Sequence, residues 1–188
     1  MSSLKIRVDK LSALVKGINE LTRKDVLVGV PESDAERKDD DPINNAALAY
    51  IHDNGSPAAN IPARPFMRPG IAAVEEKIAG RLKRAANAAI DGQTQKIEPE
   101  LEAAGMIAQA SIKKTITDGE FAPLAPATVA NRFRSRQTAS KRDAELEYAE
   151  MIRDGVPAEL AQGVAGIQPL NNTGQMRNSV TYVVRGKK

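Results

Sequence analysis

Four prolines within residues 56–70 are the feature that most limits how this chain of 188 residues can fold. The segment reads Ser-Pro-Ala-Ala-Asn-Ile-Pro-Ala-Arg-Pro-Phe-Met-Arg-Pro-Gly. Each proline fixes its own φ angle, lacks a backbone N–H and disfavours helical backbone in the residue before it. We therefore expect residues 56–70 to form an extended arm, which either docks on a partner or serves as a strand in the chain's own sheet.

Amphipathic helices are predicted on both sides of this arm. Apolar residues over 11–21 have the spacing of one helix face, and a short Ala-rich helix is predicted over 43–51. Beyond the arm, the same spacing predicts two long helices over 71–90 and 99–118 and a short one over 129–134. Because only a short polar turn joins the two long helices, we expect them to pack antiparallel.

Two short segments are predicted to be strands. Residues 26–30 read Val-Leu-Val-Gly-Val, and Val180, Tyr182 and Val184 alternate with the other residues of 179–185. Since the two segments lie near opposite ends of the chain, we expect them to pair in one small antiparallel or mixed sheet. A sheet of this kind packed against two long antiparallel helices is an α+β fold, and the length fits one domain over residues 1–188.

Two segments depart from this pattern. Residues 32–42 include six carboxylates and are too polar to pack, so we predict a mobile acidic loop. Residues 135–168 are charged at first and then rich in Ala and Gly, which is typical of an inserted helical hairpin. No Asp or Glu follows Glu159, so the charge is unevenly distributed along the chain.

The composition argues against most catalytic chemistry. The chain has no cysteine and a single histidine, His52, which removes thiolate nucleophiles and metal sites built from several histidines. The pair His52-Asp53 resembles one found in metal phosphohydrolases, but it lacks the further histidines, and we interpret it as a polar helix end. Neither common glycine-rich phosphate-binding pattern occurs. We therefore predict no enzyme, no cofactor and no metal, and the lack of a long apolar run predicts no membrane partner.

Basic residues gather in two places. The densest group contains Arg132, Arg134 and Arg136, and the acid-free end of the chain carries Arg185, Lys187 and Lys188. These side chains could contact DNA phosphates in a channel or an acidic neighbour. The alternative is a solvated surface, since the net charge is only +3.

Four motifs, in order along the chain, resemble those of the tail-completion or head–tail connector (neck) proteins of long-tailed double-stranded DNA bacteriophages. They are Leu48-Ala-Tyr-Ile-His-Asp-Asn-Gly, Ile61-Pro-Ala-Arg-Pro-Phe, Phe121-Ala-Pro-Leu-Ala-Pro-Ala-Thr128, and Pro169-Leu-Asn-Asn-Thr-Gly-Gln-Met-Arg-Asn-Ser179. Phe121 stands where Trp is common in that family, and Met176 stands where Leu is common. The matching structural positions are Tyr50, Gly55, Leu124, Thr128, Leu170, Thr173, Gly174 and Ser179. Segments 32–42 and 135–168 have no counterpart in the motif pattern.

The resemblance implies a structural virion protein that is assembled in the host cytoplasm. Such proteins form a ring, of six subunits rather than twelve, between the head-completion or portal-adaptor protein and the tail terminator, and double-stranded DNA passes through the ring. A ring needs interfaces that close by rotation, and a stiff arm docked on a neighbour could supply them. The interface hypothesis rests on Ile61, Pro62, Arg64, Pro65, Phe66 and Arg68. The alternatives are a tail terminator and a nucleic-acid-binding module.

Overall fold

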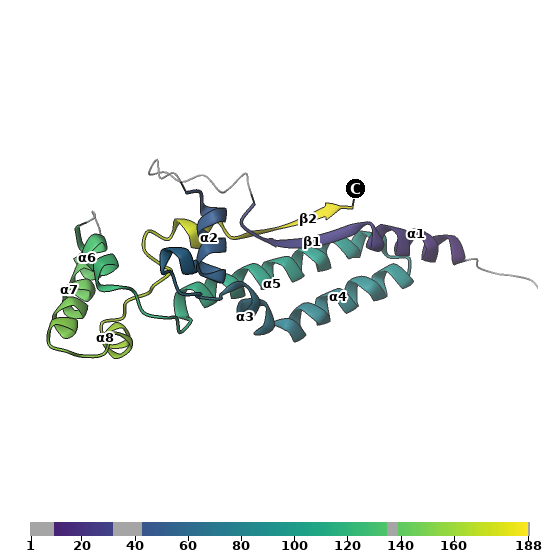
Figure 1. The fold of residues 1–188 in the computed structure, drawn as a ribbon. Coiled ribbons are helices and arrows are strands. Elements are labelled where there is room, and N and C mark those ends of the chain that lie inside the picture. The colour runs from purple at the N-terminus through teal and green to yellow at the C-terminus, as the bar shows by residue number, and fades with distance from the viewer. Residues whose placement is uncertain (1–9, 32–42, 135–138, 188) are drawn as a thin grey trace, which may run out of the picture. The chain divides into compact units, whose positions relative to one another are not determined.

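The computed structural model describes residues 10–31, 43–134 and 139–187 (Figure 1). Helices make up most of this part of the chain, and its two strands form a small antiparallel sheet, which confirms the α+β class. In chain order the elements are α1 Leu11–Thr22, β1 Lys24–Gly29, α2 Asn45–Asn54, the 3-10 turn η2 Pro57–Ala59, α3 Met67–Ala72, α4 Glu75–Ile90, the 3-10 turn η3 Thr94–Lys96, α5 Ile97–Asp118, α6 Pro126–Arg134, α7 Ala139–Arg153, α8 Ala158–Val164, α9 Gln175–Ser179 and β2 Thr181–Gly186.

The chain groups into two compact units, each assembled from distant segments. Unit 1 combines Met1–Gly29, Pro69–Ile112 and Val180–Lys188, and unit 2 combines Val30–Arg68 and Lys113–Ser179. The expectation of one domain over residues 1–188 therefore stays a prediction. The acidic loop predicted over 32–42 lies outside the described residues.

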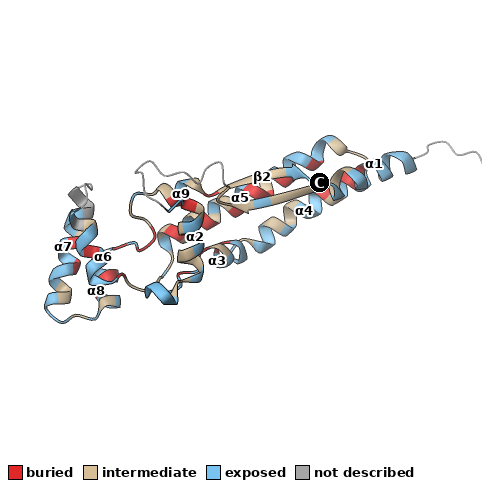
Figure 2. Cartoon of the chain, turned by 45° about the horizontal axis from the view of Figure 1, so that its top comes forward, coloured by how far each residue is buried: buried red, intermediate tan, exposed pale blue. Residues whose placement is uncertain are grey.

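Unit 1 is built on the antiparallel pair α4 and α5. Its core contains the fully or nearly buried side chains of Ala85, Ala89, Ile97 and Leu101. Buried residues recur at helical spacing along α5 (Figure 2). The small alanines of α4 let α1 approach closely, since a Cβ added to Gly17 of α1 would meet the backbone of Ala89, so a core with few aromatic residues can still pack.

The two strands pair as the sequence predicts, and the sheet covers this core with one face. Val26 lies opposite Val184, and both pack against the core of unit 1. Leu27 lies opposite Val183 on the other face, where their side chains are 40% and 48% exposed. Side chains alternate between the faces of a strand, so one face of the sheet packs inward and the other does not.

Helix α1 forms where predicted but turns a different side to its neighbour. Gly17 is buried, and a Cβ added to it would lie 2.1 Å from the backbone oxygen of Ala89 in α4. Helix α1 therefore contacts α4 through the side that carries Gly17. The apolar side chains of Leu11, Val15 and Ile18 lie away from this contact and remain exposed. The predicted apolar stripe is therefore only partly buried within the described chain.

The proline-rich segment folds into turns at its start and a helix at its end, so the expectation of an extended arm over 56–70 is wrong at both ends. Pro57–Ala59 form a 3-10 turn and Asn60 has a φ of 52°, which brings Ser56 and Ile61 together in an antiparallel bridge. Residues 62–66 have no regular structure, and α3 then begins at Met67. Pro69 lies in the first turn of α3, where a missing N–H costs the helix nothing.

The helix predicted over 71–90 forms as two helices, α3 and α4, with Ala73 and Val74 between them. Gly70 of α3 packs on α5, because a Cβ there would lie 2.9 Å from the Cα of Ile112. The helices predicted over 43–51, 99–118 and 129–134 appear as α2, α5 and α6 with small shifts of their ends. The segment 135–168 forms α7 and α8, apart from residues 135–138, which are not described.

Candidate interaction site

Three of the four motifs converge on one pocket of unit 2. The pocket has a volume of about 350 Å³ and lies between α2, α6 and the residues that lead into α9. Its lining includes His52 from the first motif, Leu124 and Thr128 from the third, and Leu170, Thr173 and Gly174 from the fourth. Motifs that are far apart in the sequence thus share one small region of the fold.

The second motif is tied to this region by Arg64. The Arg64 side chain is only 4% exposed, and its Nε donates to the backbone oxygen of Ala122 at 2.7 Å while Nη2 donates to that of Pro123 at 2.8 Å. Its backbone N–H donates to the oxygen of His52 at 2.7 Å. A guanidinium presents donors in a rigid fork, which suits two successive carbonyl groups. Arg64 therefore joins the first, second and third motifs.

Asp53 orders the exit of the proline-rich segment. Its Oδ1 accepts hydrogen bonds from the backbone N–H groups of Phe66 at 2.7 Å and Met67 at 3.0 Å. These donors lie at the start of α3, where a carboxylate satisfies orphan N–H groups and interacts favourably with the helix dipole. The same bonds hold Phe66, whose side chain is fully buried.

The single histidine is held neutral. Burial lowers the pKa of His52 to about 4, and the positive charges of Arg64 and Arg132 contribute to the same shift. The Nδ1 atom of His52 is buried and has no hydrogen-bond partner in the described part of the chain. A proton added there would place a third positive charge beside two guanidinium groups, so the site resists protonation.

The Arg132 side chain forms hydrogen bonds within unit 2. Its Nη1 donates to the backbone oxygen of Gln168 at 3.2 Å and its Nη2 to that of Pro169 at 2.5 Å. Burial lowers the pKa of Arg132, and the carboxylate of Glu145 partly offsets that shift. The guanidinium thus joins α6 to the start of the fourth motif.

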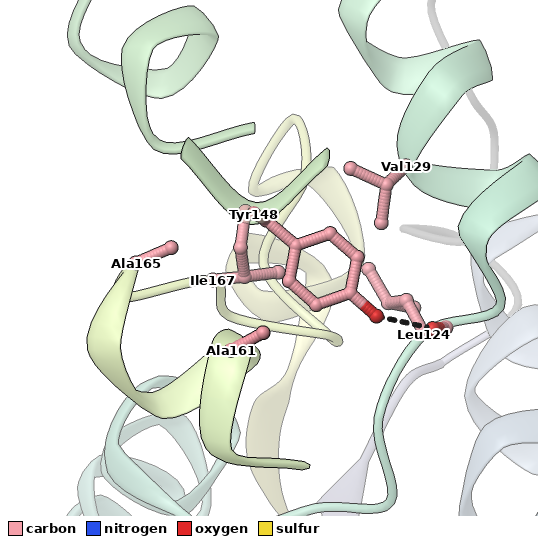
Figure 3. Packing of buried hydrophobic residues seen from close by; sticks show 6 residues of the cluster. All are labelled: Leu124, Val129, Tyr148, Ala161, Ala165 and Ile167. Carbon is pink, nitrogen blue, oxygen red and sulfur yellow. Dashed lines mark hydrogen bonds between the residues drawn. The ribbon is translucent and has the colours of Figure 1, made fainter. Parts of the chain in front are cut away.

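Two residues of the 135–168 segment hold the third motif, and the sequence pattern missed both. Tyr148 is fully buried, and its hydroxyl donates to the backbone oxygen of Leu124 at 3.0 Å (Figure 3). The Oε1 of Gln162 accepts from the backbone N–H of Leu124 at 2.9 Å, and its Nε2 donates to the oxygen of Phe121 at 3.3 Å. The sequence signal that could have pointed to this contact is Tyr148 itself, an isolated tyrosine among charged residues.

The residues of the interface hypothesis divide into two groups. Arg64 and Phe66 are buried by their own unit, whereas Pro62, Pro65 and Arg68 are exposed. Ile61 is half-buried and exchanges backbone hydrogen bonds with Ser56. The interface hypothesis stays a prediction, and the exposed positions are those that remain free to contact a partner.

The remaining motif positions are mostly structural. Gly55 ends α2 with a φ of 77° and Gly174 precedes α9 with a φ of 78°, both in the left-handed region that favours glycine. The Ser179 hydroxyl donates to the oxygen of Met176 at 2.8 Å. Tyr50 differs, since its side chain is 70% exposed on α2.

The described basic residues belong to different units. Arg134 is exposed at the end of α6 in unit 2, and Arg136 is not described. Arg185 is exposed on β2 in unit 1, and the Nζ of Lys187 lies 3.3 Å from the Asp25 carboxylate. Lys188 is likewise not described. A DNA-facing role for these residues stays a hypothesis.

Searches of family models, curated proteins and solved structures give no match for this chain. Within the described ranges, no group of three or more His, Asp or Glu side chains is placed to hold a metal ion. The helices of those same ranges include none that is both long and apolar enough to span a membrane.

Proposed function

We propose that this chain is a structural protein of the neck of a long-tailed double-stranded DNA bacteriophage. Copies of it form a ring, of six subunits rather than twelve, that joins the tail to the head connector and leaves a channel for DNA. Its partners in the virion are the head-completion or portal-adaptor protein on one side and the tail terminator on the other. The protein acts by holding these parts together and performs no catalysis.

The convergence of the motifs around the pocket of unit 2 carries this proposal. Arg64 of the second motif bonds the loop that opens the third, and Leu124 and Leu170 of the third and fourth motifs line the same pocket. Motifs that matched a family pattern by chance would have no reason to meet in space. Their meeting supports the view that they form one structural signature, and the resemblance supplies the function.

Uncovered apolar side chains favour an assembled state. Leu11 and Val15 of α1 are 65% and 49% exposed, and Leu160 and Val164 of α8 are 60% and 57% exposed. Within each pair the residues are four apart on a helix and so lie on one face. Apolar groups that gather on a surface mark sites of protein–protein contact. A ring subunit with neighbours on two sides and partners above and below would cover such sites.

The direct test is an amber mutation in the corresponding gene of the phage. We expect filled heads and tails of normal length to accumulate separately, and purified protein to restore their joining in vitro. Tails of irregular length would identify a tail terminator instead. Infectious particles that lack the chain, as judged by mass spectrometry of purified virions, would contradict the proposal.

A matched pair of variants connects this test to the site. Arg64→Ala removes the bonds to Ala122 and Pro123, whereas Arg153→Ala changes an exposed arginine of the same unit that belongs to no motif and to no part of the interface hypothesis. In the joining assay we expect Arg64→Ala protein to lose most of its activity and Arg153→Ala protein to keep it. If Arg64→Ala and Arg153→Ala restore joining equally well, the motif region does not carry the function.

A further inference from the structure

The sheet of unit 1 has room for another strand. Among the described residues, β1 pairs only with β2, so each strand keeps one edge without a strand partner. Leu27 and Val183 form an exposed apolar pair across the outer face of this sheet. An isolated pair of strands is marginally stable, and open strand edges accept further strands.

The sequence contains a segment with the pattern such a strand needs. Residues 4–8, which lie outside the described residues, read Leu-Lys-Ile-Arg-Val. Apolar residues alternate strictly with basic ones, which is the pattern of a strand with one apolar face. Beside the existing sheet, Leu4, Ile6 and Val8 would extend the apolar row that Leu27 and Val183 begin.

Geometry prevents this segment from pairing over its whole length with the sheet of its own copy. Helix α1 has 12 residues and is therefore about 18 Å long, and β1 starts directly after its C-terminal end. Figure 1 shows α1 and β1 following one another along unit 1, so the start of α1 is the end farther from the sheet. Only residues 9 and 10 separate Val8 from α1, and that length of extended chain reaches about 10 Å. Val8 therefore stays about 8 Å short of its own β1, and the segment cannot lie along that strand over its whole length as long as α1 stays helical.

We propose that residues 4–8 of one copy add as a third strand to the β1–β2 sheet of a neighbouring copy. The proposal rests on the proposed ring, because each copy would then give one strand and receive one in a head-to-tail contact. The exposed side chains of Leu11, Val15 and Ile18 follow the segment directly, and the same neighbour would cover them. The contact therefore accounts for two uncovered apolar surfaces of unit 1 together.

Proline substitution in the full-length chain tests the added strand. Lys5→Pro and Ile6→Pro, made together, remove two neighbouring backbone donors from the middle of the segment. Neighbouring N–H groups point to opposite sides of a strand, so one of the two must face the sheet that receives the segment, where proline is excluded. Ser2→Pro with Ser3→Pro makes the same change just outside the segment and serves as the control. By native mass spectrometry we expect the Lys5→Pro, Ile6→Pro protein to shift from ring to monomer, with at least a tenfold rise in the concentration needed for assembly, and the control to assemble normally. If the Lys5→Pro, Ile6→Pro protein assembles like the natural chain, the strand proposal is wrong while the ring survives.

Disulfide trapping identifies the copy that receives the strand. The chain has no cysteine, so Ile6→Cys combined with Leu27→Cys or with Val183→Cys introduces the only two thiols. Under mild oxidation we expect at least one of these pairs to give a ladder of covalently linked copies. Ile6→Cys with Lys77→Cys places the second thiol on an exposed residue of α4 in unit 1, away from the sheet, and should give no ladder. A disulfide within single copies, or no disulfide in either sheet pair, would overturn the proposal.

Discussion

The Nε of Arg64 donates a hydrogen bond of 2.7 Å to the backbone oxygen of Ala122, although 58 residues separate the two in the chain. The second bond, from Nη2 to Pro123, fixes the orientation of the guanidinium. Arg64, one of the two arginines of the proline-rich segment, therefore stabilises its own unit, because it holds the loop that leads into the third motif.

Replacing Arg64 should destabilise unit 2. Arg64→Ala leaves two backbone oxygens without their donors, and we expect the free energy of unfolding to fall by about 2 kcal/mol. Arg64→Lys keeps the charge but not the planar fork, so it should recover less than half of that loss. Urea unfolding followed by circular dichroism measures both changes, and Arg68→Ala is the exposed control. Equal stability of Arg64→Ala and Arg68→Ala would mean that the two bonds contribute nothing.

Removing the hydroxyl of Tyr148 should cost about 1 kcal/mol of stability, because the buried oxygen of Leu124 loses a donor. Tyr148→Phe keeps the ring and its packing, so it isolates the hydrogen bond. Tyr50→Phe makes the same change on a side chain that is 70% exposed and should leave the urea midpoint unchanged. A Tyr148→Phe midpoint equal to that of the natural chain would show that the 135–168 segment is not held through this bond.

The contact between α1 and α4 predicts opposite effects for two glycine substitutions. Gly17→Ala places a methyl group against the backbone of Ala89, which must move, and we expect a loss of about 2 kcal/mol. Gly80 lies on α4 with no atom within 4 Å of an added Cβ, so Gly80→Ala should stabilise the helix by up to about 1 kcal/mol. Thermal unfolding measures both. A stabilising Gly17→Ala would mean that α1 does not pack closely on α4.

The lowered pKa of His52 predicts how stability depends on pH. Above pH 6.5 the imidazole is neutral in both the folded and the unfolded chain, so it adds no pH dependence. Between pH 6.5 and about 4 the unfolded chain takes up a proton that the folded chain refuses, so stability falls as the pH is lowered. The total effect is on the order of 3 kcal/mol, and His52→Gln should remove it. Since His52 is the only histidine, its NMR titration is unambiguous, and a midpoint near 6.5 would refute the burial of this ring.

Periodicity and strand pattern gave the elements of this fold, but not the directions in which they pack. The alternation of Val180, Tyr182 and Val184 correctly predicted β2, because one face of that strand is buried against helices. The apolar spacing of α1 was equally clear, yet Leu11, Val15 and Ile18 are exposed, because a close contact at Gly17 decides which side faces α4. Spacing reports that a face is apolar and does not report where the nearest neighbour lies.

The candidate site was predictable only in part for a similar reason. The motifs marked Arg64 and Phe66 as important, but their hydrogen bonds run to Ala122 and to Asp53, which no local pattern connects to them. Prolines suggested an extended arm, whereas a left-handed Asn60 and the carboxylate of Asp53 fold both ends of the segment back. Tyr148 and Gln162 act through backbone groups of distant residues, and such bonds leave no trace in residue spacing.

The mass of the purified full-length protein tests the central claim most directly. Native mass spectrometry at micromolar concentration, with electron microscopy of the same sample, reports both the number of copies and their arrangement. The account predicts closed rings of six copies, or about 121 kDa from six chains of 20.2 kDa, with a central channel. A species of 20.2 kDa at every concentration, together with the absence of the chain from purified virions, would contradict it.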